Sequence, residues 1–433
     1  MAWQRLRLRR PFEHEHNGCE VIDVHPGLRM ALAALAISSA LGGCGTAPAT
    51  PTPTHSTTQD DHLPEGASPG ALVACGSTEV AEYTGGKWIY FPASSILSAP
   101  STIFESVDVS PTGEVAAVTS GSPDASTPGM SSANMLWTYR KGWHLVSIRN
   151  DTDVQLHTFG PDGSLYVVPD DGTLPGIWQL TASGWHQLPG SAELGYISSL
   201  AWSPKGVLTV VSVPQNGATT VWQFVNGRFV AMTSDRAPFA ADTLTVGFAP
   251  NGDLAVGTSA HGVWIDEGGR FVQPGGMPCP VTDVGQFAWS PKGMLTVSGK
   301  AGSQNGLWQF SGGRWQRVQG AGPDIGSDKI YQFGWSPHGV LTVSDASRCQ
   351  IFELVGGRWT PVWTKTHATD RNAAPPKFAW SPAGTLVTNG GDLGGLWELT
   401  PEGNWTEIGG QSSPFAGEVG VSFTFAPTRL VRS

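Results

Sequence analysis

Charged residues are scarce in this chain of 433 residues: they make up 14% of it and leave a formal net charge of −10. Such a balance argues against nucleic-acid binding and against docking through a polybasic surface. Cysteine is also rare, with five residues, and neither a CxxC pair nor a Cys/His spacing typical of zinc occurs. The sequence therefore predicts no metal site, no cofactor and no nucleic-acid partner.

Two further features are missing. Beyond the N-terminal region, no stretch approaches the roughly 18 apolar residues that a membrane-spanning helix needs. The chain also lacks Gly-x-Ser-x-Gly, His-Glu-x-x-His, a phosphate-cradling loop and the Asp-box of sialidase-like propellers. An enzyme is therefore the less favoured class, although a glycosidase-like or lyase-like activity stays open.

Glycine, proline and tryptophan are abundant instead, with 56, 33 and 18 residues, a mix that suits short strands joined by tight turns. One phrase recurs: "FAWSPKGMLTVSG" at 287–299 returns as "FGWSPHGVLTVSD" at 333–345. With its weaker copies it is marked by eight prolines spaced 41 to 50 residues apart, a period typical of repeat architectures: Pro111, Pro161, Pro204, Pro250, Pro291, Pro337, Pro382 and Pro427.

A second phrase, such as "LWQFSGGRWQRV" at 307–318, alternates with the first. Each phrase predicts a hairpin, because apolar residues alternate on both sides of a glycine-containing turn. Four antiparallel strands per period, with no room for a helix, predict an all-β fold: a single β-propeller. The hairpin at 80–91 and a final segment at 419–432 are expected to complete one shared closing blade. That gives eight blades, with seven as the alternative.

The strand–"SPKG"–strand pattern resembles WD40 repeats, and "LWQFSGGRW" is similar to the propeller repeats of two-component regulator sensors. These resemblances cover most of residues 76–432 and imply a propeller. The Gly-His and Trp-Asp dipeptides of WD40 repeats are absent, so no activity is carried over. The recurring Trp202, Trp289, Trp335 and Trp380 are interpreted as packing between blades, with an aromatic ligand platform as the alternative.

The N-terminal segment 1–43 is predicted to be a secretory signal, because an apolar run at 30–43 follows Arg29. Its length suggests that translation starts near Met30. Residues 41–44, Leu-Gly-Gly-Cys, resemble the lipobox of bacterial lipoproteins, which implies cleavage before Cys44 and acylation of that residue. An ordinary signal peptide is the alternative.

Residues 44–71, rich in Pro, Thr and Ser, are predicted to be a flexible tether, and residues 72–433 to be the propeller. The chain is thus expected to be exported and anchored to the membrane through lipid on Cys44. Cys75, Cys279 and Cys349 can form at most one disulfide and are interpreted as small buried hydrophobes.

Function is expected where the repeats differ, in the connections that share one face of a propeller. The sequence predicts a non-catalytic binding or scaffold module for protein or glycan, and a monomer. The alternatives are a propeller enzyme or sensor with its site on that face, and a purely structural envelope component. The candidate ligand-binding residues are Asp235, Arg236, His261, Asp324, Asp328, His367, Asp370, Arg371 and Asp392.

Overall fold

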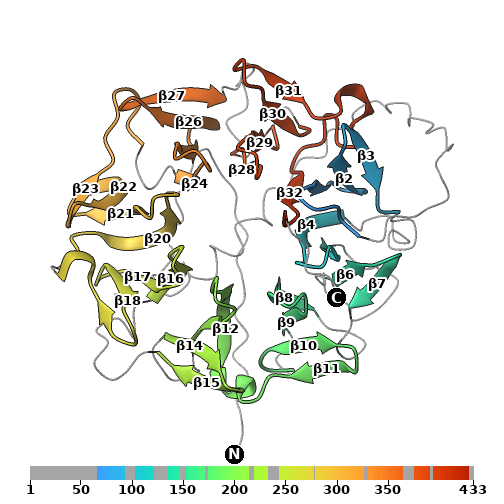
Figure 1. Cartoon of the computed structure of the whole chain (residues 1–433), viewed down its shortest axis with the longest axis horizontal. Helices are drawn as coiled ribbons and strands as arrows, with labels where there is room; N and C mark the ends of the chain where they lie inside the picture. Colours follow the sequence, from blue (N-terminus) through green and yellow to red (C-terminus); the bar gives the residue numbers. More distant parts are fainter. Residues whose placement is uncertain are drawn as a thin grey trace, which may run out of the picture. The chain divides into compact units, whose positions relative to one another are not determined.

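The computed structural model describes residues 66–92, 103–120, 135–146, 148, 153–170, 174–213, 219–232, 243–276, 278–325, 330–363, 375–390 and 394–428. These residues form eight antiparallel sheets of four strands each, and no α-helix occurs among them. The sheets follow one another around a common axis in the order of the chain (Figure 1). The fold is therefore an eight-bladed β-propeller, as the repeat period predicts, and not the seven-bladed alternative.

Seven sheets consist of four consecutive strands. The first four of them are β4 (Ile103–Val109), β5 (Val115–Ser120), β6 (Met135–Tyr139) and β7 (Trp143–Val146); β8 (Val154–Phe159), β9 (Leu165–Pro169), β10 (Trp178–Thr181) and β11 (Gly184–Gln187); β12 (Tyr196–Trp202), β13 (Leu208–Val213), β14 (Thr220–Val225) and β15 (Arg228–Ala231); and β16 (Thr243–Phe248), β17 (Leu254–Thr258), β18 (Val263–Asp266) and β19 (Phe271–Val272).

The remaining three are β20 (Thr282–Trp289), β21 (Leu295–Ala301), β22 (Gln304–Ser311) and β23 (Arg314–Arg317); β24 (Ile330–Trp335), β25 (Leu341–Asp345), β26 (Gln350–Val355) and β27 (Arg358–Trp363); and β28 (Phe378–Trp380), β29 (Leu386–Thr388), β30 (Trp397–Leu399) and β31 (Trp405–Glu407). In each of these seven sheets the first strand lies nearest the axis, and we call it the inner strand (Figure 1). The inner strands β8, β12, β16, β20 and β24 contact one another in turn. Short 3-10 turns occur at η1 (Ser191–Leu194), η2 (Pro274–Gly276) and η4 (Gly410–Ser412).

The repeated "SPKG" phrase closes the turn between the first and second strands. The Ser290 carbonyl accepts a hydrogen bond from the N–H of Gly293 (2.8 Å), and its hydroxyl accepts one from the N–H of Met294 (3.0 Å). Gly293 has φ 78°, a conformation that glycine adopts without steric cost. The phrase is thus a self-contained turn, and this is why it is repeated.

The second phrase closes the turn between the third and fourth strands. Gly312 and Gly313 have φ 60° and 76°, two successive positive values that match a type I′ hairpin turn. An antiparallel meander places both turns of a blade at the same end of its sheet. We call this end the turn face (turns such as 290–294 and 311–314) and the opposite end, with all other connections, the loop face.

The hydrophobic core lies between neighbouring sheets. The closing sheet packs on one side against the β4–β7 sheet, through Val73 and Phe104, and on the other against the β28–β31 sheet, through Trp88 and Phe415. The Trp88 indole also donates a hydrogen bond to the Ile408 carbonyl (3.2 Å). Apolar burial on both faces of this sheet closes the ring.

The closing sheet has the order β3 (Lys87–Tyr90), β2 (Val80–Thr84), β1 (Leu72–Cys75) and β32 (Ser422–Phe425). Both chain ends share it, as expected, but the division is three strands and one instead of two and two. β1 pairs with β32 in the place expected for a second C-terminal strand. The "LVAC" run is wholly buried and supplies that strand, whereas the C-terminal copy lacks the turn glycine needed for a return.

Candidate functional site along the inner strands

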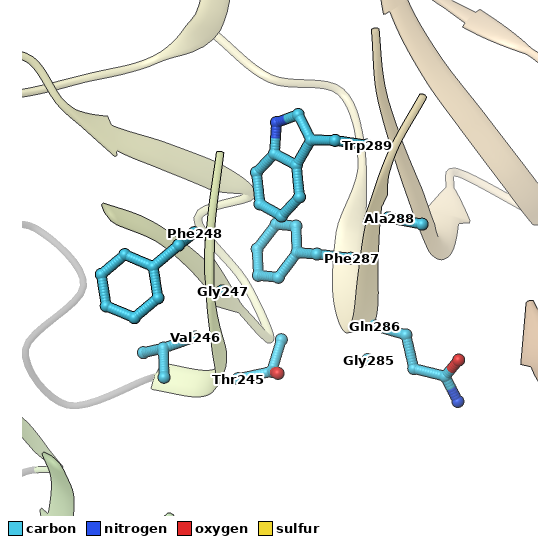
Figure 2. Close-up of a pocket in the computed structure, with 9 residues that line it drawn as sticks. All are labelled: Thr245, Val246, Gly247, Phe248, Gly285, Gln286, Phe287, Ala288 and Trp289. Atoms are coloured by element: carbon cyan, nitrogen blue, oxygen red, sulfur yellow. The ribbon is translucent and has the colours of Figure 1, made fainter. Parts of the chain in front are cut away.

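Side chains of an inner strand alternate between the two neighbouring sheets. In β20, Phe287 and Trp289 point toward β16, where a Cβ on Gly247 would lie 3.3 Å and 3.2 Å from their rings (Figure 2). The intervening residues point the other way, and Gln286 donates a hydrogen bond to the carbonyl of Tyr331 in β24 (3.1 Å). Each position of the phrase therefore faces a defined position of the next or the preceding blade.

The recurring tryptophans pack on the preceding sheet. Trp202 makes an edge contact with Tyr166 at 5.0 Å between ring centroids, and the Trp335 indole donates a hydrogen bond to the Thr296 hydroxyl (3.1 Å). These contacts agree with packing between blades. All four residues are nevertheless only half-buried, and Trp202 and Trp289 also line cavities.

An open cavity of about 590 Å³ lies along β16 and β20. Phe287 and Trp289 supply aromatic surface and Thr245 supplies a hydroxyl group, whereas the side chains of Phe248 and Gln286 point away from the space between the two strands (Figure 2). The Phe287 and Trp289 rings stack at 5.6 Å with an interplanar angle of 24°. A cavity with these groups suits a small, partly polar ligand better than an ion.

The repeated pattern breaks at the contact between β4 and β8. Aligned with β20, His157 stands where that strand has Phe287, and Asp108 stands where it has Ala288. The two side chains face each other across neighbouring blades and interact electrostatically. Burial lowers the pKa of His157 and raises the pKa of Asp108, and each group partly offsets the shift of the other.

Glutamine side chains link inner strands elsewhere. The Gln332 amide donates to the Phe378 carbonyl (2.8 Å) and accepts from the Phe378 N–H (3.0 Å), and Gln155 donates to the Ile197 carbonyl (3.1 Å). Lys377, just before β28, follows the same register as Gln332. Burial lowers its pKa, and its neighbour in the closing sheet is the thiol of Cys75.

The cysteines agree in part with the small-hydrophobe interpretation. Cys75 is fully buried and a free thiol, and burial raises its pKa far above the usual range. Cys279 is a half-buried free thiol whose pKa burial also raises. Cys349 is a half-buried free thiol, so it does not fit the interpretation as a buried hydrophobe. It has φ 51°, and its thiol lies 3.7 Å from the Ala346 carbonyl.

Of the candidate ligand-binding residues, the structure describes His261 and Asp324, and it does not bring them together. His261 is exposed, and its carbonyl accepts hydrogen bonds from Trp264 (3.0 Å) and Gln273 (2.8 Å). Asp324 pairs with Arg317 (2.9 Å). The lipidation candidate Cys44 and the other ligand candidates lie outside the described residues: Asp235, Arg236, Asp328, His367, Asp370, Arg371 and Asp392.

Within the described ranges, no cluster of three or more His, Cys, Asp or Glu side chains could hold a metal ion. None of the helical turns in that part of the chain has the length and apolarity of a membrane-crossing helix.

Neither a protein-family model nor a curated protein matches the chain. Among solved structures, it is similar to the β-propeller domain of the Trilobed protease from Pyrococcus furiosus, at 12% identity and a TM-score of 0.46, covering 72% of this chain and 96% of that one. It is similar to YCF48 bound to D1 peptide at 12% identity and a TM-score of 0.43, covering 76% of this chain and 95% of that one. It is also similar to a catalytically inactive virginiamycin B lyase from Staphylococcus aureus with Quinupristin, at 13% identity and a TM-score of 0.43, covering 67% of this chain and 93% of that one. Likeness at this level concerns the fold and assigns neither activity nor partner.

Proposed function

We propose that this chain is an exported propeller, anchored to the membrane through lipid on Cys44, that binds a protein or glycan through its loop face. The main support for the proposal is the place in the fold where the repeats differ from one another. The repeated phrases build the turn face and the sheet interfaces, whereas the segments that differ in length and sequence join the strands at the loop face. Recognition in such scaffolds resides in variable connections on a rigid frame.

A second function, a propeller enzyme, draws support from one feature, the Asp108–His157 pair. A histidine whose pKa is lowered is neutral near pH 7 and can accept a proton, and a neighbouring carboxylate can orient it. The pair lies between the inner strands β4 and β8, where a substrate would have to reach it. Loss of a measured turnover in both Asp108→Asn and His157→Gln, with unchanged folding, would favour this function over binding alone.

The anchoring is tested on Cys44. In cells, the native chain should fractionate with membranes, and its N-terminal cysteine should carry the added mass of acyl chains. More than one chain is needed for stable anchoring, and each buried CH₂ contributes about 0.8 kcal/mol. Cys44→Ala should abolish the added mass. An unmodified N-terminus downstream of residue 44 in the native protein would show an ordinary secretory signal instead.

Binding through the loop face is tested by photo-crosslinking in cells. A photoreactive residue at Ala192, exposed in η1, should give one dominant adduct with a protein or glycan. The matched control is Asn226, exposed in a turn of the opposite face. Equal adducts at both positions, or none at Ala192, would contradict the proposed binding face.

A further inference from the structure

The two ends of the propeller differ in charge. In the described turns of the turn face, nine Lys and Arg side chains are exposed, against three exposed carboxylates (Asp162, Glu267 and Glu402) and three half-buried ones (Glu114, Asp253 and Asp266). The chain as a whole carries a formal charge of −10. The turn face is thus basic on an acidic protein, through Lys87, Arg140, Lys141, Lys205, Arg228, Arg270, Lys292, Arg314 and Arg358.

At the loop face, three of the basic side chains are paired with acids. Lys300 lies 2.9 Å from Asp283, and Arg317 lies 2.9 Å from Asp324. Arg348 pairs with the buried Asp345. Exposed carboxylates there include Asp170 and Glu193. The excess positive charge of the described residues is therefore concentrated at the turn face.

The N-terminal part of the chain joins the propeller at this same turn face. Ala67 is buried, and its N–H donates to the carbonyl of Gly113 (2.7 Å), which lies in the turn between β4 and β5. Ser68 donates through its N–H (2.6 Å) and its hydroxyl (2.9 Å) to the buried Glu82 carboxylate. Gly70 donates to the carbonyl of Pro427, after β32. Residues 66–70 are thus fixed at the basic end before β1 begins.

We propose that the turn face lies against an anionic membrane surface, which directs the loop face away from the membrane. The proposal rests on the anchoring proposed above for its location. The 23 residues from Cys44 to Gly66 span at most about 75 Å, so the lipid-bearing end can reach a bilayer beside the turn face. Lysine and arginine near an anionic leaflet are attracted to it, and the attraction decays within about 10 Å at ordinary salt.

The test uses the full chain with Cys44→Ser, so that no acyl chain masks the contribution of the surface. It should sediment with phosphatidylcholine vesicles that contain phosphatidylglycerol and not with phosphatidylcholine alone, and salt should weaken binding. Neutralising four turn-face cations should lower the partition coefficient on the order of 1,000-fold, at about 1 kcal/mol for each cation. The variant is Arg228→Gln, Lys292→Gln, Arg314→Gln and Arg358→Gln.

A control variant with the same net charge adds four acids at exposed positions of the loop face, and it should bind within about threefold of the parent chain, because those charges lie beyond the Debye length. It carries Ala192→Glu, Ser303→Asp, Gln304→Glu and Gln319→Glu. All variants keep residues 1–43, so "RLRLRR" contributes equally to each.

Equal binding by both variants would overturn the proposal, as would tight binding to duplex DNA without binding to the anionic vesicles. Loss of acylation at Cys44 in cells would refute the anchor and leave this vesicle result unaffected, so the two failures are distinguishable.

Discussion

Replacing a tryptophan at two depths of the propeller tests how the aromatic rings divide between core and cavity wall. Trp359 in β27 is 3% exposed and belongs to the core cluster between the β20–β23 and β24–β27 sheets. A buried aromatic ring removes 150–250 Å² from water, worth roughly 4–6 kcal/mol at about 25 cal/mol per Å². We expect Trp359→Ala to lower the free energy of unfolding by about 3–5 kcal/mol, as in other buried positions.

Trp289→Ala should lower the free energy of unfolding by less than Trp359→Ala does, because Trp289 is half-buried and lines the cavity beside β16. Because only part of this residue stays exposed, the area term predicts a cost somewhat below that of Trp359→Ala, roughly 2–4 kcal/mol for Trp289→Ala. Urea titrations followed by far-UV circular dichroism measure both variants against the parent chain. If Trp289→Ala cost as much as Trp359→Ala, the ring would be core and the cavity interpretation would be wrong. If it cost nothing and abolished ligand binding, the ring would be a ligand platform.

Three further changes test the inner strands and the closing sheet. Asp108→Ala with His157→Phe should change the slope of melting temperature against pH between about pH 7.5 and 5.5. A histidine with a lowered pKa makes the fold lose stability as pH falls below about 6.5, and the raised pKa of Asp108 acts in the opposite direction. An unchanged slope would contradict the assignment. Deleting residues 66–75 should lower the melting temperature of the whole propeller, and an unchanged melt would refute the shared closure. Gln332→Ala removes two hydrogen bonds and should lower the free energy of unfolding by about 1–3 kcal/mol in urea titrations. Gln286→Ala removes one hydrogen bond and should lower it less. Equal losses would contradict the bridging role of Gln332.

The fold could be predicted because the information for it is local and repeated. Ser290 and Gly293 specify one turn, Gly312 and Gly313 specify the other, and apolar alternation supplies the strands between them. β1 was missed as a strand because "LVAC" is four residues long and belongs to no repeated phrase. Only its partners β2 and β32, which lie far apart in the sequence, show that it completes a sheet.

The candidate site was harder to predict. His157 and Asp108 can be seen in the sequence as departures from the repeated "FAW". Their interaction could not be predicted, because only the register of the strands shows that these two positions face each other across blades. Charge was misleading for a similar reason. A net charge of −10 argues against a polybasic surface, but it averages over two faces that the antiparallel meander separates. Most candidates chosen from the loops lie outside the described residues, and His261 and Asp324 do not form a common site.

The three-and-one closing sheet has a consequence for how the protein is made. The strands β1, β2 and β3 are synthesised first, but β1 pairs with β32, and Cys75 and Ser422 are separated by nearly the whole propeller in the sequence. The edge of β1 therefore remains without its final neighbour until the last strand has left the ribosome. Pairing over such a sequence distance is slow, and unpaired edges promote aggregation. The ring cannot close before β32 is available, so closure cannot precede the end of synthesis.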